Sequence, residues 1–179
     1  AFPLVVTAAG SDRAWAGMTI HAIAHMLAKA AMFLAAGLML KAVNGHRLED
    51  LSGLVRVMPL TVAAFGLAAI SLMGLPPSAG FIAKFLLLEA ALEQGAVFQA
   101  AILLVGGLMA AVYLFNPLSR TFAGRDTPVT EAKDTLQTAA PLALGLLAVS
   151  LGFAGQAMVD ISAGVSQAGP PAAAVGEVP

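Results

Sequence analysis

The sequence has no cysteine and little charge, and both shortages restrict what the protein can be. Without cysteine, disulfides, iron–sulfur ligation and thiolate-bound metals are excluded. Only 11% of the residues are charged, whereas a soluble domain averages about 25%. In contrast, 59% of the 179 residues are hydrophobic, and the mean hydropathy is +0.89. We therefore expect an all-α membrane protein that lies in a lipid bilayer.

Several ligand classes also lack a matching pattern. The net charge is −1 and no basic arm is present, so we expect no nucleic-acid partner. No phosphate-binding loop, catalytic triad or other cofactor motif occurs, so we predict no cofactor. His21 and His25 have the spacing of a metal-binding pair, but no carboxylate or third ligand accompanies them. We therefore predict no metal site.

Segments with polar residues, glycine or proline divide the chain into apolar stretches that form a polytopic transmembrane helix bundle. The predicted spans are residues 14–43, 59–94, 97–118 and 138–159. Residues 1–10 do not begin with methionine and resemble the end of a truncated transmembrane helix, so we expect a fragment of a longer protein. Residues 160–179 are rich in Ala, Gly and Pro and are predicted to be a disordered tail.

The span 59–94 is interrupted between residues 75 and 80 by Pro76, Pro77 and Gly80. Each half holds about 15 residues, or about 22 Å of helix, which is too short for a hydrocarbon core of about 30 Å. The two halves are therefore either two short crossings or one discontinuous helix. A helix broken at membrane depth lies inside protein or beside water, because the backbone groups that it frees need partners.

The positions of the basic residues decide between these two arrangements. If the halves form one crossing, the loops 44–58 and 119–135 share one side of the membrane and hold most of the lysines and arginines outside the spans. With two crossings this asymmetry nearly disappears. The positive-inside rule therefore favours one discontinuous helix, with both loops in the cytoplasm and the C-terminal tail external. We place the protein in the inner (plasma) membrane of the cell.

The first span carries three ionisable side chains at steps of four residues, His21, His25 and Lys29. Each step advances by about 40° around a helix, so the three form a slowly turning stripe about 12 Å long. An ionisable group in the bilayer core costs at least about 2.5 kcal/mol and indicates a functional site. The stripe predicts a proton path that includes a buried amine at Lys29. The alternatives are a lysine that snorkels to the interface and histidines that only pack.

Lys84 follows Gly80 by four residues, in the first turn of the second half-helix. A positive charge is unfavourable beside the positive end of a helix dipole, so a carboxylate at this position is predicted to be tolerated. Because ion and proton transporters place their sites at broken helices, we predict that Lys84 relays protons. An interfacial position is the alternative. Glu89 and Glu93 are a secondary candidate pair, and a solvated, interfacial role is favoured over a relay role.

Three motifs give the chain a family resemblance. The run HAIAHMLAKAAMFLAAG at residues 21–37 resembles the H-x-x-x-K-A-x-x-F-L-x-x-G helix of antiporter-like subunits. Such subunits occur in respiratory complex I, Mrp-type sodium/proton antiporters and membrane-bound hydrogenases. LSGL at 51–54 with MPL at 58–60, and GLPPSAGFIAKF at 74–85, match the next two signatures. The resemblance covers residues 14 to about 158 and departs from many relatives at Asn116 and Pro117.

This resemblance implies the second inverted repeat of an antiporter-like fold, at the C-terminal end of a proton-conducting subunit. Lys29 would be the central relay lysine, His21 and His25 would connect it to water, and Lys84 would pass protons toward the external exit. The form of the third motif is more similar to D-type antiporter subunits than to the largest complex I subunit. Other membrane subunits would be the partners, and protons or sodium the cargo. The redox chemistry of an NADH-quinone oxidoreductase would lie in other subunits.

Two other functions remain open from the sequence. A structural scaffold subunit could keep the fold without conducting, but the retained lysines at membrane depth argue against it. A quinone-reactive membrane subunit is the second alternative, and the lack of a polar, aromatic-lined headgroup site argues weakly against it.

The topology can be tested by labelling single introduced cysteines. Arg47→Cys and Arg125→Cys are expected to react from the cytoplasmic side, and Gln94→Cys from the external side. The reason is that one discontinuous crossing separates residue 94 from both basic loops. An impermeant thiol reagent added to intact cells and to inverted vesicles measures the side. Labelling of residues 47 and 125 from opposite sides would exclude the single crossing.

Overall fold

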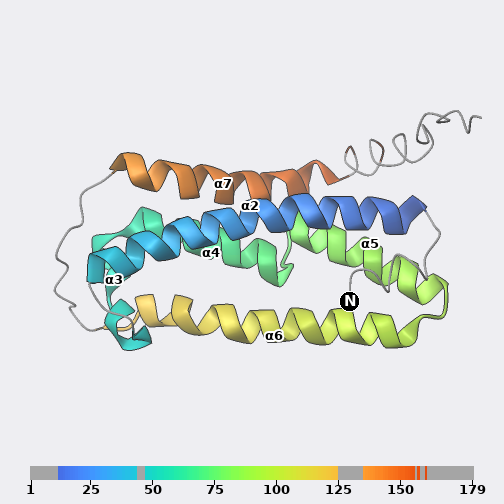
Figure 1. Cartoon of the computed structure of the whole chain (residues 1–179), viewed down its shortest axis with the longest axis horizontal. Coiled ribbons are helices and arrows are strands. Elements are labelled where there is room, and N and C mark those ends of the chain that lie inside the picture. Colours follow the sequence, from blue (N-terminus) through green and yellow to red (C-terminus); the bar gives the residue numbers. More distant parts are fainter. Residues whose placement is uncertain (1–11, 44–46, 125–134, 156, 158–159, 161–179) are drawn as a thin grey trace, which may run out of the picture.

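The computed structural model describes residues 12–43, 47–124, 135–155, 157 and 160, and the secondary structure in these ranges is helical. In chain order the elements are α2 (Asp12–Val43), η1 (Leu48–Leu51), α3 (Leu54–Val57), α4 (Pro59–Met73), α5 (Ala79–Glu93), α6 (Val97–Thr121) and α7 (Thr135–Phe153). The longer helices lie side by side along the long axis of the molecule (Figure 1). The expected all-helical bundle with one broken helix is therefore confirmed.

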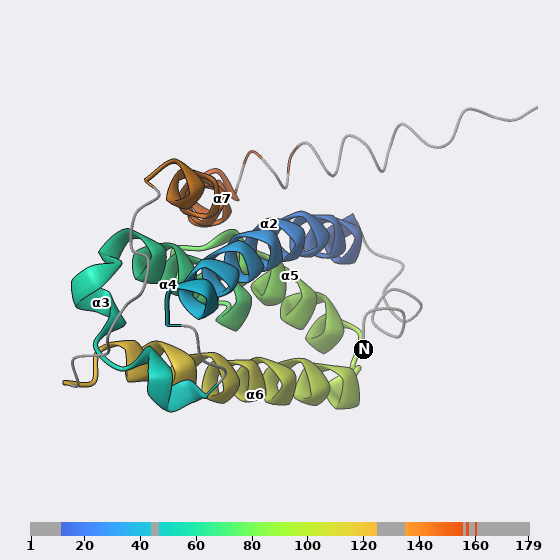
Figure 2. The same cartoon turned by 60° about the vertical axis from the view of Figure 1, so that its left-hand side comes forward.

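The helix α2 is the centre of the bundle. It packs against α4, α5 and α7, whereas α6 packs on α4, α5 and the short helix η1. In both views α7 and α6 lie on opposite sides of the layer formed by α2, α4 and α5 (Figures 1 and 2). In Figure 1 α2 and α6 both end at the left of the bundle, where η1 packs against α6.

Small side chains form the packed face of α2. The helix buries alanines that recur at steps of three and four residues, which are Ala24, Ala28, Ala31 and Ala35. Alanines of the facing helices are buried as well, including Ala64 and Ala68 of α4 and Ala79 and Ala83 of α5. In a membrane, where lipid is as apolar as leucine, helices associate through the close backbone approach that small residues allow. This packing explains the abundance of alanine in the sequence.

The helix that begins at Pro59 ends at Met73, and the next begins at Ala79. Gly74 ends α4 with a left-handed φ of 79°, a conformation that glycine adopts without steric cost, and its N–H donates to the Ile70 carbonyl. Ser78 caps the start of α5, because its Oγ accepts from the Phe81 N–H at 3.3 Å. The sequence therefore encodes both ends of the break locally.

Glycines also let the neighbouring helices approach this break closely. A Cβ added at Gly80 of α5 would overlap the carbonyl oxygen of Ser71 in α4. A Cβ at Gly152 of α7 would overlap the carbonyl oxygen of Pro77. The broken helix is therefore fixed in place by backbone contacts at which even a methyl group does not fit.

Some predicted boundaries differ from the observed ones. The segment 44–58, expected to be a loop, contains η1 and α3, and the pair Leu48–Val57 and Pro59–Met73 is bent by 117°. The last helix is bounded at Phe153, residues 155, 157 and 160 are helical as well, and the predicted end at 159 lies outside the described residues. The truncated helix at 1–10 lies outside the described residues, and so does the tail after Asp160.

Helix length and apolarity bear on the membrane spans. By both criteria Ala14–Val43 and Val97–Thr121 can each cross a membrane, and the bent pair would be a third crossing if it counts as one span. In α7 the stretch Gln137–Phe153 is apolar but shorter. The helices α4 and α5 hold 15 residues each, or about 22 Å, so neither crosses a hydrocarbon core alone. The number of crossings stays a prediction.

The close contact at Gly80 predicts a large effect of a small substitution. Gly80→Ala is expected to lower the free energy of unfolding by about 1–3 kcal/mol, because α4 and α5 must move apart to admit the methyl group. Gly37→Ala in α2 is the matched control, since its Cβ would meet nothing within 4 Å. The control is expected to be neutral or stabilising by up to about 1 kcal/mol. Thermal unfolding in detergent measures both, and equal stability of the two variants would contradict the prediction.

Candidate functional site at the helix break

The side chain of Lys84 extends back from α5 to the end of α4. Its Nζ donates to the carbonyl oxygens of Leu72 at 2.9 Å and Met73 at 2.8 Å. The last carbonyls of a helix have no partner within the helix and carry the negative end of its dipole. The amine therefore caps α4. The predicted location of Lys84 at the break is confirmed. The helix dipole expected to act on it was the wrong one, because the amine lies at the negative end of α4 and not at the positive end of α5.

Two glycines leave space for this amine. A Cβ added at Gly74 would lie 2.6 Å from Cδ and 3.1 Å from Nζ of Lys84. A Cβ added at Gly107, on the neighbouring helix α6, would lie 3.7 Å from the same Nζ. An ammonium group has three N–H donors, and the two carbonyls accept from two of them. Gly107 therefore faces the amine from α6 with no side chain of its own.

The two predicted histidines of α2 lie together and near the break. The rings of His21 and His25 stack with their centroids 5.5 Å apart and an interplanar angle of 21°. His21 is half-buried and His25 is exposed. Both imidazoles interact electrostatically with Lys84, and His25 also interacts with Lys29. The packing of α2 on α5 therefore brings the two histidines close enough to Lys84 to interact with it, although they are far apart in the sequence.

Lys29 differs from the expectation of a buried amine. Its side chain is exposed in this chain, and its Nζ lies 5.5 Å from the centroid of the Phe33 ring, a cation–π distance. The reason is the same 40° step that defines the stripe. The buried face of α2 follows its alanines, whereas each step of four residues turns the stripe further from that face. His21 is therefore near the packed interface and Lys29 is outside it.

The secondary acidic candidates lie elsewhere on α5. Glu89 is half-buried and Glu93 is exposed near the end of the helix. Glu89 follows Lys84 by five residues, which places it about 140° around the helix. Within the part of the chain that the structure describes, no group of three or more His, Cys, Asp or Glu residues gathers as a metal site would require.

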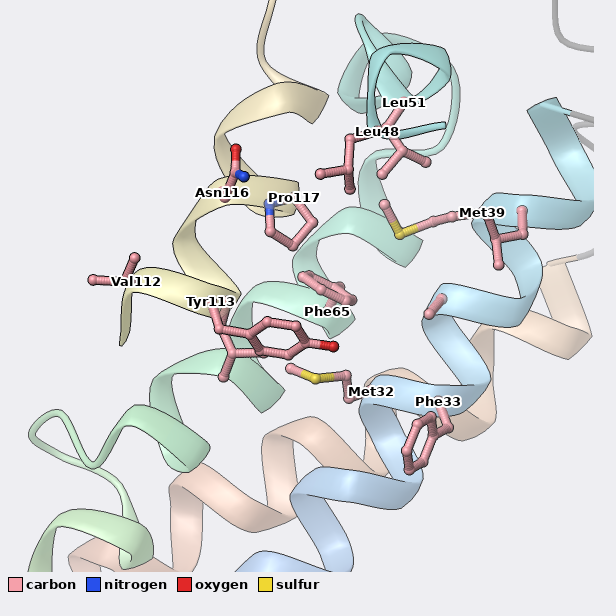
Figure 3. A pocket seen from close by; sticks show the side chains of 13 residues that line it. Met32, Phe33, Met39, Leu48, Leu51, Phe65, Val112, Tyr113, Asn116 and Pro117 are labelled. Carbon is pink, nitrogen blue, oxygen red and sulfur yellow. The ribbon is translucent and has the colours of Figure 1, made fainter. Parts of the chain in front are cut away.

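The structure also contains an apolar pocket that the sequence did not predict. Its volume is 450 Å³ and it lies between α2, α4, α6 and η1 (Figure 3). The ring of Tyr113 points into it from α6, toward Phe65 and Met32. None of the predicted relay residues lines the pocket. Because four separate elements contribute to it, no spacing along the chain could have indicated it.

The fold and this site define a class of protein: a helical membrane protein with a lysine at a broken helix and a second ionisable stripe on the adjacent helix. Comparison with known families agrees. The family described as NADH:quinone oxidoreductase/Mrp antiporter, TM matches residues 1–110, and the chain belongs to this family. It is thus an antiporter-like membrane subunit.

Individual relatives include subunits of NADH-quinone oxidoreductases. NADH-quinone oxidoreductase subunit N of Desulforudis audaxviator is 32% identical over 155 residues, which are 81% of this chain and 31% of that protein. NADH-quinone oxidoreductase subunit L of Mycobacterium tuberculosis strain H37Rv is 35% identical over 127 residues, or 67% of this chain and 20% of that protein. The chain thus spans about a third or less of these relatives. The expected similarity to a D-type subunit stays a prediction.

A solved structure shows the same arrangement of helices. The structure of the Mrp complex from Dietzia sp. DQ12-45-1b contains a chain with a TM-score of 0.78 and 26% sequence identity. The match covers 90% of this chain and 39% of that one. The fold is therefore that of antiporter-like subunits over nearly the whole length of the present chain.

The cap at Lys84 changes the expectation for a carboxylate at this position. Lys84→Glu is expected to be less stable than Lys84→Met by about 1–2 kcal/mol, because an ionised carboxylate would face two carbonyl oxygens at the negative end of α4. Methionine is the matched neutral variant, since it removes the donor without adding a negative charge. Melting temperatures in detergent compare the two. A glutamate variant as stable as the methionine variant would show that the cap does not govern this site.

Proposed function

We propose that this chain is part of a proton-conducting antiporter-like subunit, in which protons move through His21, His25, Lys29 and Lys84. The subunit would work within a multi-subunit NADH-quinone oxidoreductase-like or cation/proton antiporter complex of the inner (plasma) membrane. The observation that carries the proposal is the arrangement at the break: the amine of Lys84 lies at the end of α4, and the stacked imidazoles of His21 and His25 lie on α2, the helix that packs against α5.

The geometry suggests an order for the proton transfers. Lys29 on the exposed side of α2 would exchange a proton with His25, one helical turn away. His25 stacks on His21, and the two imidazoles would pass the proton between them through water. Lys84 would then take up and release it at the break. Each group gains or loses one positive charge in turn, so repulsion within the series favours only partial protonation at any time.

Other parts of the complex would complete this path. Lys29 is exposed in the chain, and an uncompensated amine in hydrocarbon is costly. A neighbouring segment or subunit that covers the outer face of α2 would therefore supply its partner. In the orientation favoured by the positive-inside rule, the loops 44–58 and 119–135 would face the cytoplasm and Lys84 would lie on the external side of the relay. Protons would be the cargo, with sodium as the alternative ion.

Replacement of Lys29 tests the proposed function. Lys29→Ala in the full-length subunit, assembled in its complex and reconstituted in liposomes, is expected to reduce proton uptake at least about tenfold, because a relay loses its central acid–base group. Lys41→Ala in the last turn of α2 is the matched control and should transport like the wild type. Assembly of both variants is checked by their content of partner subunits.

The same experiment separates the alternative roles. Wild-type proton uptake with alanine at position 29 would reduce Lys29 to packing and would favour the scaffold function. Loss of uptake together with loss of the partner subunits would instead indicate a role in assembly. Only loss of uptake in a fully assembled complex supports the proton relay.

A further inference from the structure

The side chain of Lys84 physically joins the two halves of the broken helix. It belongs to α5, but both of its hydrogen bonds go to carbonyl oxygens in the last turn of α4, at 2.9 and 2.8 Å. A side chain that crosses a break in this way holds the two halves together as well as occupying the site. Its strength as a connection therefore depends on the state of the amine.

The charge of the amine determines this strength. A protonated amine makes charge-assisted hydrogen bonds, which are about twice as strong as neutral ones. It is also attracted by the negative end of the α4 dipole, which carries about half an elementary charge. A neutral amine still donates but loses both contributions. The connection across the break therefore weakens when Lys84 gives up its proton.

We propose that Lys84 is a protonation-dependent clasp between α4 and α5, and that Gly74 is the positioning residue that makes room for it. This inference rests on the proposed function, because it assigns a structural consequence to each proton that the relay would pass through Lys84. The clasp is closed when the amine is protonated and loosens when the proton leaves. The break would thus respond mechanically to the proton that it carries.

Gly74 is required for two separable reasons. Its φ of 79° favours glycine, and a Cβ there would lie 2.6 Å from Cδ of Lys84. Gly95, in the turn between α5 and α6, has a similar φ of 67°, but a Cβ there would meet nothing within 4 Å. Alanine at either position therefore introduces backbone strain, whereas only alanine at 74 displaces the lysine. The two glycines form a matched pair for an experiment.

Few other charges act on the clasp from the surrounding helices. The described helices α4 and α7 contain no charged residue, and α6 carries Arg120 in its last turn and the titratable Tyr113, whose ring points into the apolar pocket. The titratable side chains that face Lys84 from α2 are His21 and His25, and α5 itself also carries Glu89 and Glu93. A background with both histidines replaced by glutamine therefore separates the response of Lys84 from that of its neighbours on α2.

A spin label in the break tests the clasp without any transport measurement. Leu75 is 47% exposed and lies between the two half-helices. We would introduce Leu75→Cys as the single cysteine of the full-length subunit, label it, and record its mobility by electron paramagnetic resonance in nanodiscs. No proton gradient is present. The spectrum is recorded from neutral to strongly alkaline pH, in the wild-type and in the histidine-to-glutamine background.

The expected result is a reversible shift from an immobile to a mobile line shape as the pH rises, in both backgrounds. Lys84→Met should give the mobile line shape at every pH. Gly74→Ala should do the same, whereas Gly95→Ala should keep the wild-type pH response. In the Lys84→Met background, Gly74→Ala should add no more mobility than Gly95→Ala does, because the coupled partner is already gone.

The outcomes distinguish the clasp from the proton relay. A label whose mobility is the same in wild type and Lys84→Met at neutral pH would overturn the clasp, whatever the transport rate. An identical pH response in Gly74→Ala and Gly95→Ala would overturn the assignment of Gly74. A pH response as expected, combined with normal proton uptake in the Lys29→Ala variant, would support the clasp and remove the proposed function.

Discussion

The rest of this structure depends on one requirement, that the carbonyl groups freed at the end of a helix inside a membrane must find hydrogen-bond donors. At the end of α4 the donor is the amine of Lys84, which bonds to Leu72 and Met73. Gly74 provides the turn and the space, and Ser78 begins the next helix. The free carbonyl groups and the lysine amine would each be costly in lipid alone, and here they are hydrogen-bond partners. Each therefore stabilises the other.

The packing around the break follows from the same requirement. Lipid provides no hydrophobic drive for helices to associate, so backbone contact has to supply it. The alanines of α2 and the glycines at 80 and 152 bring α4, α5 and α7 to distances at which a methyl group no longer fits. Such contacts fix the half-helices against each other and against α7. At the break, the side chain of Lys84 adds a hydrogen-bonded connection to these backbone contacts.

The sequence predicted the helical bundle, the break and the family, because proline pairs, glycines and lysines in apolar segments are strong local signals. The direction of the Lys84 side chain was beyond such signals, since its partners belong to the preceding helix. The exposure of Lys29 was missed because the spacing of the stripe shows how it rotates around α2 but does not show which face of α2 packs against other helices. The pocket at Tyr113 was missed because it combines four elements. The sequence therefore predicted features that depend on neighbouring residues, whereas contacts between different helices could be seen only in the structure.

The turn of the α2 stripe has a consequence for direction. Between His21 and Lys29 a straight helix advances by about 12 Å and rotates by about 80°. The stripe begins half-buried at His21 and ends on the outer surface at Lys29. A proton that followed the stripe would move along the membrane normal and, at the same time, around the axis of α2 toward its outer side. A path along this stripe would therefore leave the chain through the side of α2 at Lys29 and not through either end of the helix.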